Sequence, residues 1–222
     1  MMENIEIREE LFSIGGEDYQ IRSLKDLQQY SDCLGLAERE QITPTNWSHF
    51  GVVWPAGLVL ARRIASMELQ PVSMLELGCG LGLASLVASR RGADITASDY
   101  HPLVQSFLDH NADANGLTRI KYIKGDWRKP ITRAGKFGLL IGSHLLYERQ
   151  QPEQLAVFID CHAQPDATVI ICDPDRRQLS RFSRLMSSNG FSSSKEDIPP
   201  QLLMGKRFRG KILTYVRTAS TL

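Results

Sequence analysis

Three glycines at alternating positions, followed by a more distant acid, are the residues best suited to chemistry in this sequence. Gly78, Gly80 and Gly82 come directly after the apolar run 74–77. Glycine lets the backbone turn tightly and approach a ligand without a Cβ in the way. Asp99 lies 21 positions after Gly78, where a carboxylate can accept hydrogen bonds from both hydroxyls of a ribose. The spacing predicts a nucleoside-binding site, and a helix N-cap or a surface charge is the simpler alternative for Asp99.

The acid before the first glycine favours one nucleoside cofactor over another. Glu76 suits a ligand with a cationic amino-acid tail, whereas it would repel the pyrophosphate of NAD. The dinucleotide pattern G-x-G-x-x-G fits only with Ser85 in place of its last glycine, or with Leu83 there in another register. The E-x-G-x-G-x-G loop resembles motif I of class I methyltransferases. This resemblance implies S-adenosylmethionine as the cofactor.

A second cofactor contact is expected after the third strand, at Gly125-Asp126-Trp127. In class I methyltransferases, which this region resembles, an acid or amide here reaches the adenine amino group and an aromatic ring packs on the base. The resemblance therefore implies that Asp126 and Trp127 line the adenine site. Packing within the core is the alternative for Trp127.

Two further motifs narrow the resemblance to one family. Val52-Val53-Trp54-Pro55 precedes the helix that leads to the glycine loop, and Ile141-Gly142-Ser143-His144-Leu145-Leu146-Tyr147-Glu148 follows the fourth expected strand. Over about residues 51–173, the chain resembles the family 16 methyltransferases, a methyltransferase-like group that includes many protein lysine N-methyltransferases. The resemblance implies that Trp54 and Ser143 contact the cofactor, that the three glycines form its loop, and that the acid after the second strand holds its ribose.

One position departs from the pattern of that family. Its motif after the fourth strand is usually D-x-x-Y, but here His144 takes the aspartate position while Tyr147 is retained. An aspartate would orient an ammonium group, whereas a neutral imidazole can accept a proton or a hydrogen bond. We hypothesise that His144 and Tyr147 are catalytic residues that flank the acceptor and orient a nitrogen nucleophile. A capping role is the alternative for His144, and the departure leaves lysine specificity open.

The motifs leave several acceptors and activities possible. The resemblance implies an N-methyltransferase that acts on a protein side chain, and a small-molecule N-methyltransferase of nicotinamide type shares much of this architecture. The His144 departure keeps a non-catalytic cofactor-binding scaffold open, while the lack of a Ser/Tyr/Lys proton relay disfavours an NAD-dependent oxidoreductase. His49 and His101 are expected near the active edge in surface or capping roles. Trp47 and Phe50 are expected to form a lid or to pack in the core.

A sheet is needed to bring these residues to one edge, and the chain has the pattern for it. From residue 73 onward, apolar runs alternate with glycine-rich turns and helical segments, which indicates βαβ units with right-handed crossovers. We expect strands at 74–77, 94–98, 120–124, 137–141, 168–172, 191–198 and 209–217, and helices at 55–67, 83–91, 103–115, 152–162 and 179–189. No helix separates the last two strands, which predicts an antiparallel hairpin at one edge.

The expected fold class is α/β, a doubly wound Rossmann-like sheet that is mostly parallel and ends in an antiparallel C-terminal hairpin. Residues 5–22 alternate in polarity around Gly15-Gly16, which predicts a β-hairpin, and residues 24–35 read as a short helix. We therefore expect two parts, an N-terminal extension at residues 1–50 and a class I methyltransferase domain at residues 51–222.

Composition excludes several classes of protein. The 222 residues include 26 basic and 25 acidic side chains, a net charge of +1, which predicts no nucleic-acid partner and no membrane partner. No apolar run approaches the ~18 residues that a bilayer span needs, and the polar first ten residues do not resemble a secretory signal. The four cysteines lack C-x-x-C spacing, so we expect reduced thiols, no metal site and a cytoplasmic location. The expected partner is a protein or small-molecule methyl acceptor.

Overall fold

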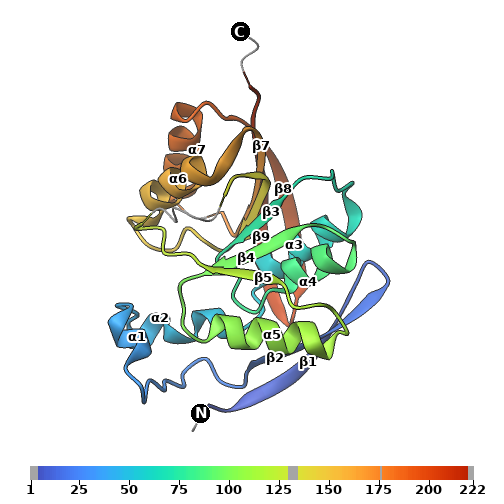
Figure 1. Ribbon diagram of the computed structural model, residues 1–222, viewed down its shortest axis with the longest axis vertical. Coiled ribbons are helices and arrows are strands. Elements are labelled where there is room, and N and C mark those ends of the chain that lie inside the picture. Colours follow the sequence, from blue (N-terminus) through green and yellow to red (C-terminus); the bar gives the residue numbers. More distant parts are fainter. Residues whose placement is uncertain (1–4, 130–134, 176, 220–222) are drawn as a thin grey trace.

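A seven-stranded sheet runs through the molecule and carries helices on both faces (Figure 1). The computed structural model describes residues 5–129, 135–175 and 177–219. In chain order its elements are β1 (Ile7–Ile14), β2 (Glu17–Leu24), α1 (Leu36–Arg39), α2 (Pro44–Trp47), η1 (Ser48–Gly51), α3 (Pro55–Ser66), β3 (Met74–Leu77), α4 (Leu83–Arg90), β4 (Ile95–Asp99), α5 (Val104–Ala114), β5 (Lys121–Lys124), β6 (Phe137–Ser143), α6 (Gln151–His162), β7 (Ala163–Asp173), α7 (Leu179–Ser188), β8 (Ser192–Leu203) and β9 (Lys206–Arg217).

The order of the strands creates the place for a site. They lie in the order β5-β4-β3-β6-β7-β9-β8. Strands β5 to β7 run parallel, while β9 is antiparallel to both β7 and β8. The chain moves outward from β3 to β4 and β5, then crosses back to β6 on the other side of β3. In such sheets, ligands bind at the carboxyl ends of the strands beside this reversal. The α/β fold with a mostly parallel sheet and a closing hairpin is confirmed.

Two buried apolar clusters cover the two faces of the sheet. One contains side chains of α3, α4, α5 and the N-terminal hairpin, and the other contains side chains of α6 and α7. All four residues of β3 and all five of β4 are buried. Strands covered on both faces read as continuous apolar runs. This is why β3 can be predicted from the sequence although it is only four residues long.

The hairpin β1–β2 forms its own two-stranded sheet and is held against α5 by two asparagines. The Asn115 side chain accepts from the Gln20 amide at 2.9 Å and donates to its carbonyl at 2.7 Å. Asn111, which is fully buried, accepts from the Arg22 amide at 2.8 Å and donates to the Leu81 carbonyl at 3.1 Å. Asn111 therefore links the N-terminal hairpin to the glycine loop.

Most of the expected elements lie within a few residues of the observed ones, but one is wrong. Residues 24–35 form no helix, and the first helix, α1, begins only at Leu36. The Asp32 carboxylate accepts from the amides of Ala37 at 3.0 Å and Glu38 at 2.9 Å, so this segment caps the next helix. The strands β8 and β9 are also longer than expected, because they continue to the turn at residues 204–205. No helix in the described ranges combines the length and apolar character of a membrane span.

Candidate functional site

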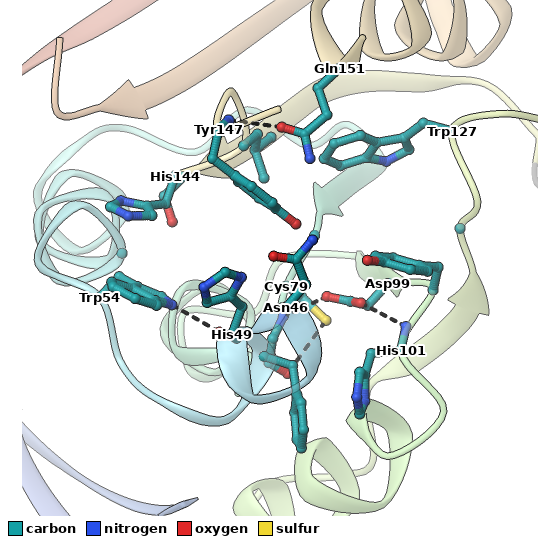
Figure 2. A pocket seen from close by; sticks show the side chains of 18 of the residues that line it. Asn46, His49, Trp54, Cys79, Asp99, His101, Trp127, His144, Tyr147 and Gln151 are labelled. Atoms are coloured by element: carbon teal, nitrogen blue, oxygen red, sulfur yellow. Dashed lines mark hydrogen bonds between the residues drawn. The ribbon is translucent and has the colours of Figure 1, made fainter. Parts of the chain in front are cut away.

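A cavity of about 570 Å³ lies at the carboxyl ends of β3, β4 and β6 (Figure 2). Its volume falls within the ~300–1,000 Å³ of ordinary small-molecule sites. All the residues that the sequence analysis assigns to the site line this one cavity: Trp54, Glu76, Gly78, Gly80, Gly82, Asp99, Asp126, Trp127, Ser143, His144 and Tyr147. The structure thus brings them together, and the role of each stays a prediction.

The glycine loop forms one wall of the cavity with left-handed backbone. Gly78, Gly80 and Gly82 have φ angles of +59°, +52° and +77°. A Cβ at Gly80 would lie 2.9 Å from the carbonyl oxygen of Phe50, and a Cβ at Gly78 would lie 2.8 Å from the Leu145 side chain. Both the conformation and the space therefore require glycine here.

Asp99 ends β4 beside this loop and fixes its shape. Its carboxylate accepts from the Gly80 amide at 3.0 Å and from the His101 amide at 2.9 Å. Burial raises the pKa of Asp99, although these amide hydrogen bonds oppose the shift. A carboxylate has about four acceptor positions, and Asp99 faces the cavity (Figure 2), so its oxygens can still accept from a ligand hydroxyl.

Glu76 is buried in β3 and bonds to the start of α4. It accepts from the Ser85 amide at 2.9 Å and also from the Ser85 hydroxyl. Burial raises its pKa to about 7, and the Ser85 hydrogen bonds limit this rise. Ser85, which occupies the place of a dinucleotide-motif glycine, thus serves as a partner of the acid. At neutral pH, Glu76 can change its protonation state in response to a nearby charge.

Trp127 and Asp126 lie after β5 at the same edge. The Trp127 ring would contact a Cβ at Gly78 at 3.4 Å, so it packs directly against the glycine loop. Asp126 accepts from Arg128 through its backbone amide at 3.0 Å and its Nε at 2.8 Å. Partial burial raises the pKa of Asp126, but the Arg128 hydrogen bonds outweigh it and leave the pKa below its usual value. The ion pair restricts how far Asp126 can turn toward a ligand.

Four rings from separate segments form an aromatic wall, defined as His49, Trp54, His144 and Tyr147. Trp54 stacks on His144 with centroids 4.6 Å apart and 17° between the planes. The His49 ring packs edge-on against two others, with its centroid 5.8 Å from that of Trp54 and 5.5 Å from that of Tyr147. The Trp54 indole donates to the His49 carbonyl at 2.9 Å. Figure 2 places Trp54 and His144 on the side of the cavity away from Asp99 and Trp127, with His49 and Tyr147 between the two sides.

The loop after β6 presents the two residues expected to be catalytic. His144 has a φ of +60°, an uncommon conformation for a residue with a side chain, and its amide donates to the Cys172 carbonyl at 2.9 Å. A hydrogen bond joins the hydroxyls of Tyr147 and Tyr100, and burial is the main cause that raises the pKa of both. Ser143 ends β6 with its hydroxyl against Gly57. Strand β6 and the loop after it thus bring three side chains to the cavity.

Several residues lining the cavity were not assigned to it by sequence reasoning. His49 and His101 both line it, and His101 is 4% exposed, so a surface role is wrong for His101. Its ring stacks on Phe50 at 4.0 Å, its Nδ1 accepts from the Leu103 amide at 3.2 Å, and burial lowers its pKa to about 3. Trp47 is 1% exposed. Of its two expected roles, a lid or core packing, the structure shows core packing.

The N-terminal segment reaches across the cavity to the loop after β6. Asn46, which lines the cavity, donates from Nδ2 to Glu148 Oε1 at 2.7 Å. No local signal in the sequence marks this contact, since 102 residues separate the two. Within the described residues, no group of three or more His, Cys, Asp or Glu is arranged to hold a metal ion.

Comparison with known proteins places these features in a family. A family model described as lysine methyltransferase matches residues 39–189, more than half of the chain. The chain is 28% identical over 163 residues to the protein N-lysine methyltransferase METTL21A of Xenopus tropicalis, which covers 69% of this chain and 75% of that protein. It is 29% identical over 161 residues to the protein-lysine methyltransferase METTL21E of Bos taurus, covering 64% of this chain and 55% of that protein.

A solved structure with a bound ligand has the same fold. The magnesium protoporphyrin IX methyltransferase (ChlM) of Synechocystis PCC 6803, solved with bound SAM, aligns with a TM-score of 0.58 at 16% identity. The alignment covers 87% of this chain and 89% of that chain. The methyltransferase fold expected from the sequence is therefore confirmed.

Proposed function

This chain belongs to the lysine methyltransferase family and is a methyltransferase, and from that premise we propose that it methylates a lysine side chain of a protein with S-adenosylmethionine as donor. The observation that carries the proposal is the single cavity that joins the glycine loop and Asp99 to the aromatic wall. One side offers groups for a nucleoside, and the other offers rings for a cationic acceptor.

The residues on the nucleoside side fit the proposed cofactor. Glycine at positions 78 and 80 gives the loop its left-handed backbone and leaves no side chain between that backbone and a ligand. Asp99 would accept from the ribose hydroxyls, Trp127 would pack on the adenine, and Glu76 would balance the charge of the amino-acid tail. Because the pKa of Glu76 lies near 7, a cationic group beside it favours its ionised form.

Bound S-adenosylmethionine supplies an electrophilic methyl group on a sulfonium. The work left to the protein is alignment of the nucleophile and exclusion of water. Trp54 and Ser143 would contact the cofactor. The other rings of the aromatic wall would shape the acceptor channel, with His144 and Tyr147 flanking the nitrogen. A lysine has an ordinary pKa near ~10.4, so it must lose a proton before attack. A neutral His144 imidazole can accept a hydrogen bond from the acceptor nitrogen and orient its lone pair.

We also propose that residues 1–50 are a working part of the enzyme and that residues 51–222 form the methyltransferase domain. The extension supplies Asn46 and His49 to the cavity, which supports this view. We propose a cytoplasmic location, because Cys79 and Cys172 are buried free thiols. A protein acceptor is favoured over a nucleic acid, because carboxylates line the cavity and would repel phosphates.

Calorimetric titration with S-adenosylmethionine, S-adenosylhomocysteine and NAD tests the cofactor. We expect the two adenosyl ligands to bind, Asp99→Asn to weaken both, and NAD not to bind. A matched control is Asp113→Asn, which changes an exposed acid of α5 paired with Arg119. Tight NAD binding without adenosyl binding would contradict the proposal.

The acceptor is tested by incubating the protein with radiolabelled S-adenosylmethionine and a cell lysate, then hydrolysing the labelled proteins to amino acids. Labelled methyl-lysine is the expected product. Label found only in methyl-histidine would overturn the lysine assignment. Label found only in small molecules would favour the nicotinamide-type alternative.

A further inference from the structure

The carboxylates that line the cavity differ in what neutralises them. Glu40 forms an ion pair with Lys124, and Asp126 forms one with Arg128 at 2.8 Å. These two acids already have cationic partners. A ligand cation would have to compete with a lysine or an arginine to reach either of them.

Two other lining carboxylates, Glu76 and Asp99, are buried below the mouth. Both accept hydrogen bonds from backbone amides, Glu76 from Ser85 and Asp99 from Gly80 and His101. They lie 4% and 8% exposed. Their positions beside the glycine loop suit the nucleoside side of the cavity rather than an acceptor that enters from solvent.

Glu148 differs from all of these. Its side chain is exposed, it lines the cavity next to Tyr147, and its one hydrogen-bond donor among the described residues is the neutral amide of Asn46, at 2.7 Å. In the described part of the chain it belongs to no ion pair, so no side-chain cation there competes with a ligand for its carboxylate. The Asn46 contact occupies one oxygen and leaves the other for an incoming donor.

The surroundings of Glu148 add a second contribution to cation binding. The ring of Tyr147 belongs to the aromatic wall and meets His49 at 5.5 Å, and Trp54 lies behind His49 at 5.8 Å. Aromatic faces attract cations, and their flat surfaces also pack against methylene chains. A carboxylate held at the edge of such a wall matches the two parts of a lysine side chain, the charged head and the apolar stem.

Resting on the proposed function, we propose that Glu148, held by Asn46, binds the ammonium group of the acceptor lysine while the aromatic wall holds its methylene chain. Opposite charge stabilises the protonated amine. Glu148 therefore captures and places the acceptor and does not activate it. This assigns capture to Glu148 and leaves orientation of the deprotonated nitrogen to His144 and Tyr147.

The direct test uses n-butylammonium, the side chain of lysine alone, as the probe. The full chain is saturated with S-adenosylhomocysteine, and the probe is titrated while the ring signals of His49 and His144 are followed by NMR. We expect these signals to shift in the wild-type protein. In Glu148→Gln the dissociation constant should rise about threefold to fivefold, as for a solvent-exposed ion pair. Asn46→Ala should weaken binding less, because the carboxylate is kept but no longer held.

Two controls separate this role from a general effect of charge. Glu153→Gln removes an equal charge from a half-buried position of α6, where Glu153 pairs with Arg181 at 2.5 Å, and it should leave probe binding unchanged. The neutral probe 1-pentanol should bind wild type and Glu148→Gln equally. The proposal fails if butylammonium shifts neither histidine ring, if Glu148→Gln binds it like wild type, or if Glu153→Gln weakens it as much.

The outcome is distinguishable from failure of the proposed function. Calorimetry with S-adenosylhomocysteine is run on each variant beforehand, and Glu148→Gln should bind it like wild type. If wild type binds S-adenosylhomocysteine but not butylammonium, the role of Glu148 is overturned while the methyltransferase assignment stands. If wild type does not bind S-adenosylhomocysteine, the proposed cofactor is wrong.

Discussion

At the scale of single residues, the stacked pair of Trp54 and His144 tests how the acceptor side works. We expect His144→Ala to lower turnover roughly tenfold to a hundredfold, because a group that orients the nucleophile is lost. Affinity for S-adenosylhomocysteine should stay close to that of wild type. Steady-state kinetics on an identified acceptor and calorimetry would measure the two effects. His110→Ala is the control, since His110 lies on α5, 3.5 Å from Glu9. Equal losses of turnover and affinity, or no loss, would contradict the assigned role.

A second residue-scale prediction concerns the pH dependence of stability. The pKa of Glu76 is about 7 in the folded protein and near its ordinary 4.5 when unfolded. Between these two pKa values, the folded state keeps the proton on Glu76 and the unfolded chain releases it. The stability that this proton contributes is fully present below pH 4.5 and is lost as the pH rises through about 7.

Glu76→Gln removes this titration. From about pH 5 to about pH 8, the free energy of unfolding of wild type should fall by on the order of 2 kcal/mol more than that of the variant. Urea unfolding without cofactor at both pH values measures it. Glu153→Gln serves as the control because it changes an acid of α6 that lies outside the cavity and pairs with Arg181. The same pH dependence in wild type and Glu76→Gln would show that Glu76 does not titrate as argued.

The residues of the site that could be predicted are those with local signals. The three glycines and Asp99 follow from spacing around one strand–turn–helix unit, and the motif after β6 adds His144. The sequence gives no place for Asn46 and sets His49 only near the active edge, because their partners Glu148 and Tyr147 lie about 100 positions away and no local pattern encodes such contacts. The Ser85 partner of Glu76 depends likewise on how α4 folds back on β3.

At the scale of elements, the sheet was predictable and one N-terminal segment was not. The strands β3, β6 and β7 contain apolar runs, so their type and place can be read directly. The strands β4 and β5 contain polar residues, and they are predicted from their places in the alternation of strands and helices. Residues 24–35 have the composition of a helix but no buried face to stabilise one. Isolated short helices are marginal in water, and Asp32 instead caps α1.

The docking of β2 on α5 gives a prediction at this scale. Asn111→Ala removes the partners of the Arg22 amide and the Leu81 carbonyl at a buried position. We expect a loss of about 2–3 kcal/mol in the free energy of unfolding, because buried groups are left unsatisfied. Urea unfolding measures it. Asn115→Ala, at a more exposed contact with Gln20, should cost about 1 kcal/mol, and a larger loss there than at Asn111 would contradict the argument.

At the scale of the whole molecule, the cavity is a joint product of distant parts of the chain. The segment before α3 supplies Asn46 and His49, the β3–β4 region supplies the glycine loop and Asp99, and the loop after β6 supplies Tyr147. The parallel sheet brings the last two together, because carboxyl ends of neighbouring strands share an edge. The hairpin β1–β2, which packs on α5, positions the segment before α3. No single segment contains a complete binding site.

The contact between Asn46 and Glu148 also constrains the order of events during synthesis. A ribosome adds about 5–20 residues per second, so Asn46 waits roughly 5–20 s for the 102 residues that separate it from its partner. The neighbouring Trp47, 1% exposed, packs edge-on against His101 and so also depends on a segment that is made later. A part of the chain that is made early thus reaches its native surroundings only after later segments have been made. Newly made chains should stay incompletely folded at least until the loop after β6 has emerged, and the sheet is completed only when β9 and β8 follow.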